Sequence, residues 1–457
     1  MSTRIGSRRD FIKVVAVTAP LAPTILARGR ATQHGAGSRS TAPSDSIRFG
    51  TIGMGGMGFG DTRTALEVQG TEFVAAADCY DGRLLRVKEI YGSEVTTTRD
   101  YRELLERSDV DAVIVATSDH WHAQIAIEAM QAGKAVYLEK PMVHDLEEGP
   151  QVLKAERVTG KVLQIGSQYV SSLLYEKARQ LYQSGAIGTL NMVEASYNRN
   201  SATGAWQYSV PTDASPQTVD WQTFLGSAPK RPFDPLRFFR WRNYWDYGTG
   251  IPGDLFVHLF SGIHLVLGSN GPNRVFSTGG LRHWKDGRDV PDIVMSLFDY
   301  SANDSHPAFN MALQVNFADG SGGGTLFRFV GDEGVMTIGT DEVKVTRVGA
   351  RSEPGYTVGT FTEDQREAFM EQYRKDYPQP KRASLVPSSE KLYRTPRDYN
   401  SSLDHFTNFF SAMRGGDSVV EDAAYGYRAA APALICNLSY RENRPYGWDP
   451  EKMKVVA

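Results

Sequence analysis

The sequence contains few cysteines and little net charge. Only two of its 457 residues are cysteines, Cys79 and Cys436, and neither stands in a CxxC or Cys/His spacing. The sequence therefore allows one disulfide at most, and it supports neither a disulfide framework nor a structural zinc site. The formal net charge is -3, which gives no reason to expect binding to nucleic acid or to an anionic membrane. We predict no metal centre and no nucleic-acid partner.

Long apolar stretches are also absent after the first segment of the chain. That segment reads SRRDFIKVVAVTAPLAPTILA, in which Arg8 and Arg9 precede an apolar run too short to span a bilayer comfortably. Residues 7–13 match the twin-arginine export signal. The alternative interpretation of this segment is an amphipathic N-terminal helix. A Gly/Ser/Thr-rich linker follows. We expect residues 1–44 to be a signal peptide and linker, with the twin-arginine machinery as partner and the periplasm as destination.

Two patterns of secondary structure follow each other along the rest of the chain. Residues 45–166 alternate short apolar strands with helices, which is typical of a parallel sheet covered on both faces. Residues 167–457 contain strands with period-two alternation and Gly-rich turns, followed by two helices. We predict an α/β Rossmann domain and then an α+β domain with a large, mainly antiparallel open sheet. Residues 350–402 are polar and interrupted by prolines, and we interpret them as a lid or a surface insertion.

A glycine cluster, GMGGMG at residues 53–58, lies directly after a strand and opens a helix. Such glycines let the backbone approach a pyrophosphate, whose charge the helix N-terminus favours, whereas the alternative is a bare structural turn. The predicted contacts in this loop are Gly53, Gly55, Gly56, Met57 and Gly58. Asp78 ends the next strand, about twenty residues on, where a carboxylate can bind ribose hydroxyls. NAD is therefore favoured over NADP, although Arg83 could reverse this preference.

Two further strands of the same sheet end in polar residues. VIVATSDHWHA places Thr117 and His120 at the carboxyl edge of the sheet, where ligands of open α/β sheets bind. VYLEKPMVH brings Glu139 and Lys140 to the same edge. We predict that these four residues contact the cofactor, while His120 has the alternative of capping or packing. Pro141 would hold Lys140 rigidly at its position.

A third cluster, GDLFVHLFSGIHLVLG, contains Asp254 and His258 four residues apart. On a helix they share one face and can meet one site. Hydride transfer from a carbinol needs a base for the hydroxyl proton, and an imidazole is suited to that role near neutral pH. A nearby lysine can stabilise the developing oxyanion. We predict Lys140, His258 and Asp254 as the catalytic set.

An arginine- and aromatic-rich stretch, RFFRWRNYWDYGTG, precedes this cluster. We interpret it as a sugar platform, in which rings stack on the apolar faces of a pyranoside and polar groups bond its hydroxyls. The alternative is a core aromatic cluster capped by surface arginines. The predicted substrate contacts are Tyr169, Arg240, Arg242, Asp246, Asp254 and His258.

Together these clusters resemble the Gfo/Idh/MocA family of NAD(P)-dependent oxidoreductases from about residue 47 to the end of the chain. The resemblance implies a catalytic Lys140, a His258 acid/base, and an Asp254 that partners the substrate or Lys140. It also implies a dimer or tetramer. The segment departs from the family's DxGxHxxD pattern at Phe256 and Ser261. The export signal resembles the branch typified by glucose–fructose oxidoreductase, which retains its nucleotide.

The leading hypothesis is an exported oxidoreductase that moves a hydride between a sugar or polyol carbinol and a tightly bound nicotinamide cofactor. Because the cofactor pool lies inside the cell, a second hypothesis is a redox-neutral glycosidase that oxidises a sugar transiently, eliminates the glycosidic substituent and returns the hydride. A third is a non-catalytic protein that binds nucleotide and sugar.

Overall fold

The computed structural model describes residues 46–347, 357–377 and 391–456. The predicted export signal and linker lie outside these residues, as does part of the 350–402 segment. All described elements belong to one unit, Pro43–Ala457. Within the described part of the chain, no helix is both long and apolar enough to cross a membrane.

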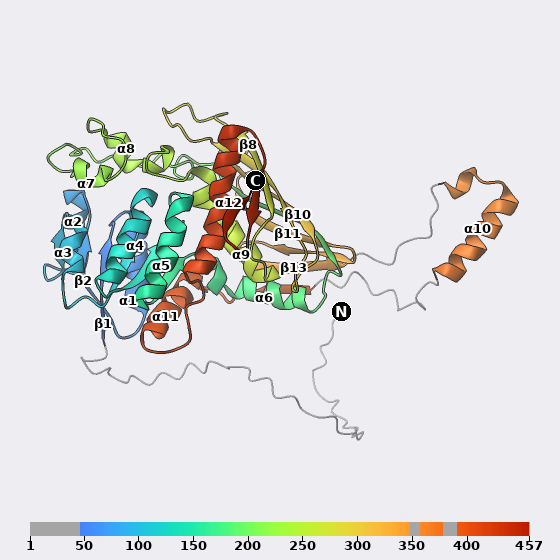
Figure 1. Ribbon diagram of the computed structural model, residues 1–457, viewed down its shortest axis with the longest axis horizontal. Helices are drawn as coiled ribbons and strands as arrows, with labels where there is room; N and C mark the ends of the chain where they lie inside the picture. Colours follow the sequence, from blue (N-terminus) through green and yellow to red (C-terminus); the bar gives the residue numbers. More distant parts are fainter. Residues whose placement is uncertain (1–45, 348–356, 378–390, 457) are drawn as a thin grey trace, which may run out of the picture. The chain divides into compact units, whose positions relative to one another are not determined.

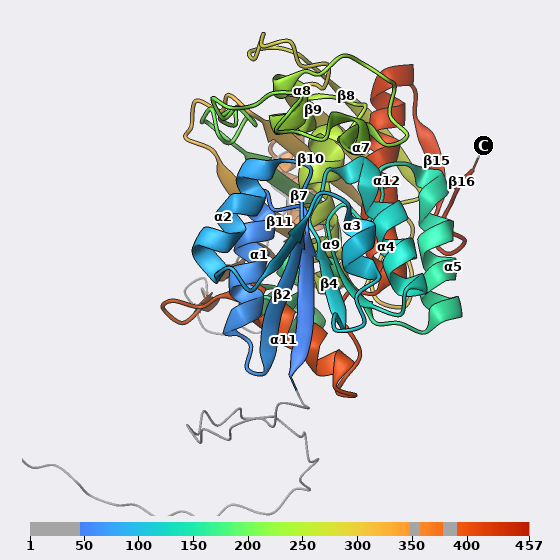
Figure 2. The same ribbon diagram turned by 90° about the vertical axis from the view of Figure 1, so that its left-hand side faces the viewer.

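The first sheet is parallel and six-stranded, in the order β3-β2-β1-β4-β5-β6. Its strands are β1 (Ile47–Ile52), β2 (Thr71–Ala77), β3 (Thr96–Thr98), β4 (Ala112–Val115), β5 (Ala135–Glu139) and β6 (Leu163–Gly166). Strands β4 and β5 are buried along their whole length because helices cover both faces (Figure 2). These helices are α1 (Gly56–Glu67), α2 (Asp81–Tyr91), α3 (Tyr101–Leu105), α4 (His122–Gln131) and α5 (Gly149–Thr159). The predicted Rossmann arrangement is confirmed, with its topological switch point between β1 and β4.

The second sheet has ten strands in the order β14-β13-β12-β11-β7-β10-β9-β8-β15-β16. Strands β7 and β10 are parallel and the other pairs are antiparallel, which confirms the predicted mainly antiparallel sheet. The strands are β7 (Leu190–Asn198), β8 (Arg274–Gly280), β9 (Ile293–Tyr300), β10 (Phe309–Asn316), β11 (Gly324–Gly331), β12 (Gly334–Ile338), β13 (Glu342–Arg347), β14 (Lys391–Arg394), β15 (Tyr446–Asp449) and β16 (Lys454–Val456). Burial alternates along β9 because one face packs on helices and the other is open.

Three helices cover the inner face of the second sheet: α6 (Leu173–Gln183), α9 (Val257–Leu267) and α12 (Ala423–Glu442). Helix α12 also contacts α5 and β6, so it lies between the two sheets (Figure 1). One continuous core therefore runs from Ile52 in the first sheet to Trp448 in β15. Helix α11 (Ser401–Met413) packs Phe406 and Phe410 into a second core against the first sheet.

The segment predicted as a lid or insertion contributes two described elements. One is helix α10 (Glu363–Asp376), which has no buried residue among those described. Strand β14 adds to the edge of the second sheet by pairing with β13. The short helices α7 (Trp221–Leu225) and α8 (Pro235–Phe239) lie in the long connection after β7 and pack in an aromatic cluster of their own.

Candidate active site

Lys140 and Asp254 form a buried ion pair where the two domains meet. The Lys140 Nζ donates to Asp254 Oδ1 at 2.8 Å and to the backbone oxygen of Asp254 at 2.9 Å. Two of the three N–H donors of the ammonium group are thus occupied, which leaves one for a substrate oxygen. The peptide bond between Lys140 and Pro141 is cis, and the ring of His122 contacts the Pro141 carbonyl through Nδ1 at 2.7 Å. The ammonium group of Lys140 is therefore held by Asp254, and the carbonyl of the next residue is held by His122.

Asp254 also accepts a hydrogen bond from Arg242 Nε at 3.1 Å. Burial alone would raise the pKa of this carboxyl, but the charges of Lys140 and Arg242 bring its pKa well below the usual range. Asp254 is therefore an ionised carboxylate that holds two cations. The resemblance left open whether Asp254 partners the substrate or Lys140; the structure shows its contact with Lys140, and a substrate contact stays a prediction.

The backbone around Asp254 differs from the regular helix that the four-residue spacing predicted. Residues Pro252–Phe256 form a π-helical turn, which continues into α9. Thr249 crowds this turn, because a Cβ on Gly253 would lie 2.1 Å from its hydroxyl oxygen. Such π turns occur frequently at functional sites. Asp254 and His258 still meet at Lys140, whose charge acts on the pKa of both.

His258 is half-buried, and its ring lies against two tyrosines. The centroid distances are 5.3 Å to Tyr169 and 6.2 Å to Tyr197. Its Nδ1 has no hydrogen-bond partner in the described part of the chain. Desolvation, followed by the charge of Lys140, lowers the pKa of the imidazole well below 6.5. The ring is therefore neutral at physiological pH and can accept a proton.

Glu139, the residue before Lys140, is buried and has a raised pKa. Burial raises it to about 7, against the opposing effects of Lys140 and of a hydrogen bond from Gln168 Nε2 at 3.1 Å. Burial and the charge of Glu139 likewise raise the pKa of Asp61 in α1. Both acids are desolvated, and it is unfavourable for the two carboxyl groups to be ionised at the same time.

The glycine loop has the shape that a pyrophosphate needs. Gly53 has φ of +91°, and Gly58 lies so close to it that a Cβ there would be 2.0 Å from the Gly53 oxygen. At Gly55 and Gly56, an added Cβ would meet no heavy atom of the described residues within 4 Å. The loop is thus tight on its protein side and open in front of the N-terminus of α1, where phosphate oxygens are stabilised.

Asp78 fixes this loop from the end of β2. Its carboxylate accepts hydrogen bonds from the backbone N–H of Met54 at 2.7 Å and of Tyr80 at 2.9 Å. Arg83 Nη1 lies 3.2 Å from it. Asp78 and Arg83 border the same cavity. The contact of Asp78 with the ribose stays a prediction. NADP stays the alternative cofactor, because Arg83 is placed where it could offset the charge of Asp78.

A cavity of about 410 Å3 extends from the glycine loop to Arg242. Four aromatic side chains from residues 221–241 border it, and we call them the roof: Phe224, Phe238, Phe239 and Trp241. Arg83 lies over the rings of Phe238 and Phe239 at 5.6 and 5.4 Å. Thr117 and Met57 also border the cavity, and their contact with the cofactor stays a prediction. The aromatic stretch interpreted as a sugar platform therefore lies mainly over the cofactor cavity.

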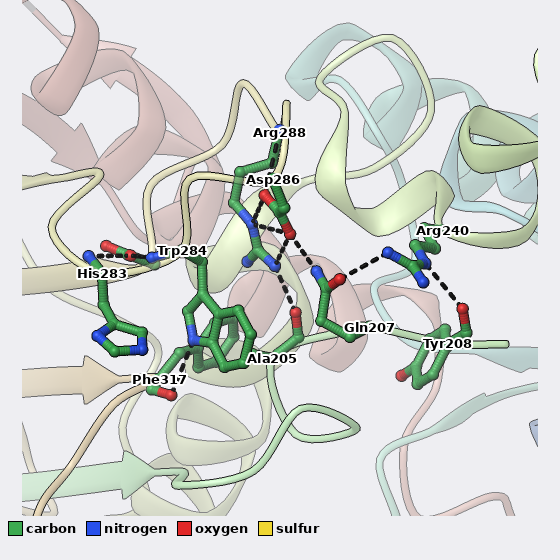
Figure 3. A network of polar contacts seen from close by, with 10 residues as sticks. Ala205, Gln207, Tyr208, Arg240, His283, Trp284, Asp286, Arg288 and Phe317 are labelled. Carbon is green, nitrogen blue, oxygen red and sulfur yellow. Dashed lines mark hydrogen bonds and ion pairs between the residues drawn. The ribbon is translucent and has the colours of Figure 1, made fainter.

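Two of the predicted sugar ligands are used within the protein. Arg240 donates to Gln207 Oε1 at 2.6 Å and to the Tyr208 carbonyl at 2.7 Å (Figure 3). Asp246 is paired with Arg231 and Arg237 at 2.7 and 3.1 Å. Arg242 and Tyr169 are the predicted substrate residues that the structure brings to Asp254 and His258.

Arg240 belongs to a network that joins two loops of the second domain (Figure 3). Gln207 contacts Asp286, and Asp286 pairs with Arg288, which donates to the Ala205 carbonyl at 2.6 Å. These bonds hold the 205–208 segment in place, and Tyr208 of that segment borders the cofactor cavity. The role of Arg240 that the structure supports is to position this segment.

His120 supports the roof. Its Nε2 contacts the Phe224 carbonyl at 2.9 Å, and its ring lies against Phe224 and Tyr247. Burial lowers its pKa to about 4. Packing, the alternative weighed for this residue, is what the structure shows.

Sequence reasoning overlooked Arg199, which follows β7. Its guanidinium lies 5.0 Å from the centroid of the Tyr197 ring, and its charge contributes to lowering the pKa of both Asp254 and His258. No motif in the sequence marks it, because it joins the site through strand β7 of the second sheet.

Comparisons with known proteins agree with this geometry. Residues 47–167 match the family description "oxidoreductase family, NAD-binding Rossmann fold", and residues 178–277 match that of the C-terminal alpha/beta domain of the same family. The chain belongs to the Gfo/Idh/MocA family. The first domain is thus an NAD-binding domain, as the glycine loop predicted.

Three similar proteins illustrate the range of the family. Inositol 2-dehydrogenase of Salmonella typhimurium is 31% identical over 176 residues, 38% of this chain and 50% of that protein. An alpha-N-acetylgalactosaminidase of Shewanella oneidensis is 29% identical over 231 residues, 44% of this chain and 50% of that protein. The chain thus spans about half the length of these curated relatives. Levoglucosan dehydrogenase, solved with NADH and levoglucosan, shares the fold with a TM-score of 0.62 at 18% identity, covering 88% of this chain and 98% of that one.

Proposed function

We propose that the protein is an oxidoreductase that acts on a CH–OH group of a sugar or polyol with a nicotinamide cofactor. The observation that carries this proposal is the buried Lys140–Asp254 pair beside the neutral imidazole of His258. These groups supply a fixed donor for the carbinol oxygen and a base for its proton. The sugar and polyol names among the relatives support the substrate class.

The chemistry divides between His258 and Lys140. A nicotinamide held at this site would supply the hydride acceptor for the carbinol carbon, or the hydride donor for the carbonyl in the reverse direction. His258 takes the hydroxyl proton as the C–H bond breaks, and returns it in the reverse direction. The remaining N–H of Lys140 donates to the same oxygen and stabilises its negative charge. Asp254 keeps the ammonium in position.

The cofactor is proposed to remain bound between turnovers. The roof aromatics and Arg83 border the cavity, and contact of the nucleotide with these rings would slow its release. NAD is the favoured nucleotide, and NADP is the alternative because of Arg83. Mass spectrometry of the nucleotide released from purified protein tests identity and retention together.

Export by the twin-arginine pathway to the periplasm is part of the proposal. It rests on the Ser7–Lys13 motif of the sequence. A homo-oligomer is proposed as well, because the open face of the second sheet exposes Met295 and Leu297. Fractionation of cells that produce the full chain tests the first proposal, and light scattering tests the second.

A redox-neutral glycosidase is the second candidate, favoured by the alpha-N-acetylgalactosaminidase among the relatives. In that reaction the C3 hydroxyl loses its proton to the protein and its carbon loses a hydride, which acidifies the C2–H. A base takes the C2 proton as the C1 substituent leaves with a proton; water then adds at C1 and C2 regains a proton; finally the hydride returns to C3 and a proton to its oxygen. The net reaction is hydrolysis, without consumption of NAD. The non-catalytic alternative predicts that no sugar changes the absorbance of the bound nicotinamide.

Release of 4-nitrophenol from aryl glycosides without added nucleotide distinguishes the candidates. Release with no net change in nicotinamide absorbance identifies the glycosidase. A stoichiometric absorbance change without release identifies net oxidation.

A further inference from the structure

A second cavity lies on the other side of the catalytic cluster. It encloses about 770 Å3 between α6, the strands β11 to β13 and the segment 394–401. Tyr169 and Tyr197 line it, and the same two rings contact His258. These tyrosines therefore connect the catalytic histidine to the second cavity.

The walls of this cavity combine ring faces with hydroxyl and charged groups. The Tyr169 hydroxyl is hydrogen-bonded to Tyr197 and to Thr325, so three hydroxyls meet at the inner end. Thr340, Asp341 and Arg397 line the outer part. Aromatic faces with several hydroxyl partners are the surroundings that carbohydrate rings prefer, since one side of a pyranoside is apolar and its rim is polar.

The position of the catalytic cluster between two cavities restricts how a substrate lies. Arg242 borders the cofactor cavity and holds Asp254, whereas Tyr169 borders the second cavity and contacts His258. A dinucleotide fills the first cavity from the glycine loop onwards. For a substrate that places one carbinol at Lys140, the second cavity is then the described space next to His258 into which the rest of the molecule can extend.

We propose that the second cavity binds the part of a glycoside that lies beyond the oxidised sugar ring. The substrates would then be glycosides or oligosaccharides rather than free monosaccharides. This inference rests on the proposed function, and it applies to net oxidation and to the redox-neutral glycosidase alike.

The test compares free and substituted forms of the same sugars. N-acetyl-D-galactosamine, D-galactose and D-glucose are each offered free and as the α- and β-4-nitrophenyl glycosides. The readouts are the absorbance of the bound nicotinamide and the release of nitrophenol. For the sugar that reacts, we expect the glycoside to reach half-maximal rate at a concentration at least about tenfold lower than the free sugar.

Two variants locate this effect in the cavity. Thr340→Trp narrows the outer part, and we expect it to raise the half-saturating glycoside concentration about tenfold while the free sugar is unaffected. Arg397→Ala, which removes a lining side chain at an exposed position, should act in the same direction. Thr346→Trp is the matched control, because Thr346 is exposed on the same β-hairpin but does not line the cavity among the residues described.

The outcomes separate the inference from the proposed function. If the free sugar and the glycoside reach half-maximal rate at the same concentration, the inference is wrong and the proposed function is unaffected. The inference is also wrong if the variants at Thr340 and Arg397 shift the half-saturating concentrations of the free sugar and the glycoside equally, or shift neither. If no sugar in either form changes the nicotinamide absorbance or releases nitrophenol, the proposed function itself fails.

Discussion

Lys140 Nζ and Asp254 Oδ1 lie 2.8 Å apart although 114 residues separate them in the sequence. Lys140 follows the last residue of β5 in the first sheet, and Asp254 lies in the π turn that leads into α9 beneath the second sheet. The active site is thus completed only when the two domains pack on each other. The continuous core that α12 helps to form holds this arrangement in place.

Lys140→Met is expected to abolish chemistry while leaving the nucleotide bound. Methionine keeps much of the aliphatic volume but removes the donor to the substrate oxygen, and we expect kcat to fall about a thousandfold. The measurement is the sugar-dependent change in bound nicotinamide absorbance, together with mass spectrometry of the retained nucleotide.

Lys134→Met is the matched control. Lys134 is as buried as Lys140, but its Nζ donates to the carbonyls of Arg107 and Val110, on the side of the first domain away from Asp254. Its loss should lower stability and leave the turnover of folded protein unchanged. If Lys140→Met turns over at the rate of this control, the catalytic assignment of Lys140 is wrong.

The role of His258 predicts where activity falls in acid. The base must be neutral to accept a proton, and its pKa lies well below 6.5 because of desolvation and Lys140. Activity should therefore persist at pH 6.5 and decline only as the pH drops through this lowered pKa. The measurement is the pH profile of kcat in the oxidative direction, and a midpoint at or above 6.5 would contradict the assignment.

Variants of two neighbouring histidines test the same assignment. His258→Gln should lower kcat by about a hundredfold to ten-thousandfold, and kcat should no longer decline at low pH, which is the acid limb of the profile. His264→Gln is the control, since His264 lies further along α9, where its Nε2 contacts the Tyr300 hydroxyl at 3.2 Å. That variant should keep the acid limb of the unmodified protein.

The parts of the site that could be predicted are those in which one local segment dictates the chemistry. GMGGMG follows one buried strand and EKP ends another, so both could be placed at the edge of a parallel sheet without a structure. The order of strands and helices likewise follows from hydrophobic period. These predictions held because each depends on fewer than about fifteen consecutive residues.

The parts that could not be predicted depend on which surface a segment faces. The stretch 237–250 has the composition of a sugar platform, yet Phe238 and Phe239 face the cofactor cavity and Asp246 pairs with arginines. Its direction is set by packing against Tyr80 and Trp221, which no local pattern encodes. The position of Arg199 also depends on long-range packing, because β7, the strand before it, reaches the site by pairing with β10 and β11.

The raised pKa of Glu139 predicts how stability depends on pH. The folded protein keeps this carboxyl protonated up to about 7, whereas 4.5 is its ordinary value. Folding thus takes up a proton between these values, and the contribution of Glu139 to stability falls as the pH rises through this window. Across this window the contribution of Glu139 to the free energy of unfolding falls by on the order of 3 kcal/mol at most.

Glu139→Gln removes this titration and keeps an acceptor for Gln168. The variant should therefore gain stability relative to the unmodified protein as the pH rises from about 5 to about 8. Thermal unfolding midpoints of the nucleotide-loaded proteins, measured across this range, check the prediction. A constant difference between the two proteins would show that Glu139 does not titrate there.

The roof predicts which substitutions release the cofactor. Phe239 borders the cofactor cavity and lies over Arg83, so Phe239→Ala should open the cavity and raise the rate of nucleotide dissociation by about tenfold or more. Phe233→Ala is the control, because Phe233 packs edge-on against Trp221 in the same aromatic cluster without bordering the cavity among the described residues. Dissociation is followed by the loss of bound nucleotide during gel filtration. If both variants lose nucleotide at the same rate, general loosening of the segment explains the effect, and retention does not depend on the roof.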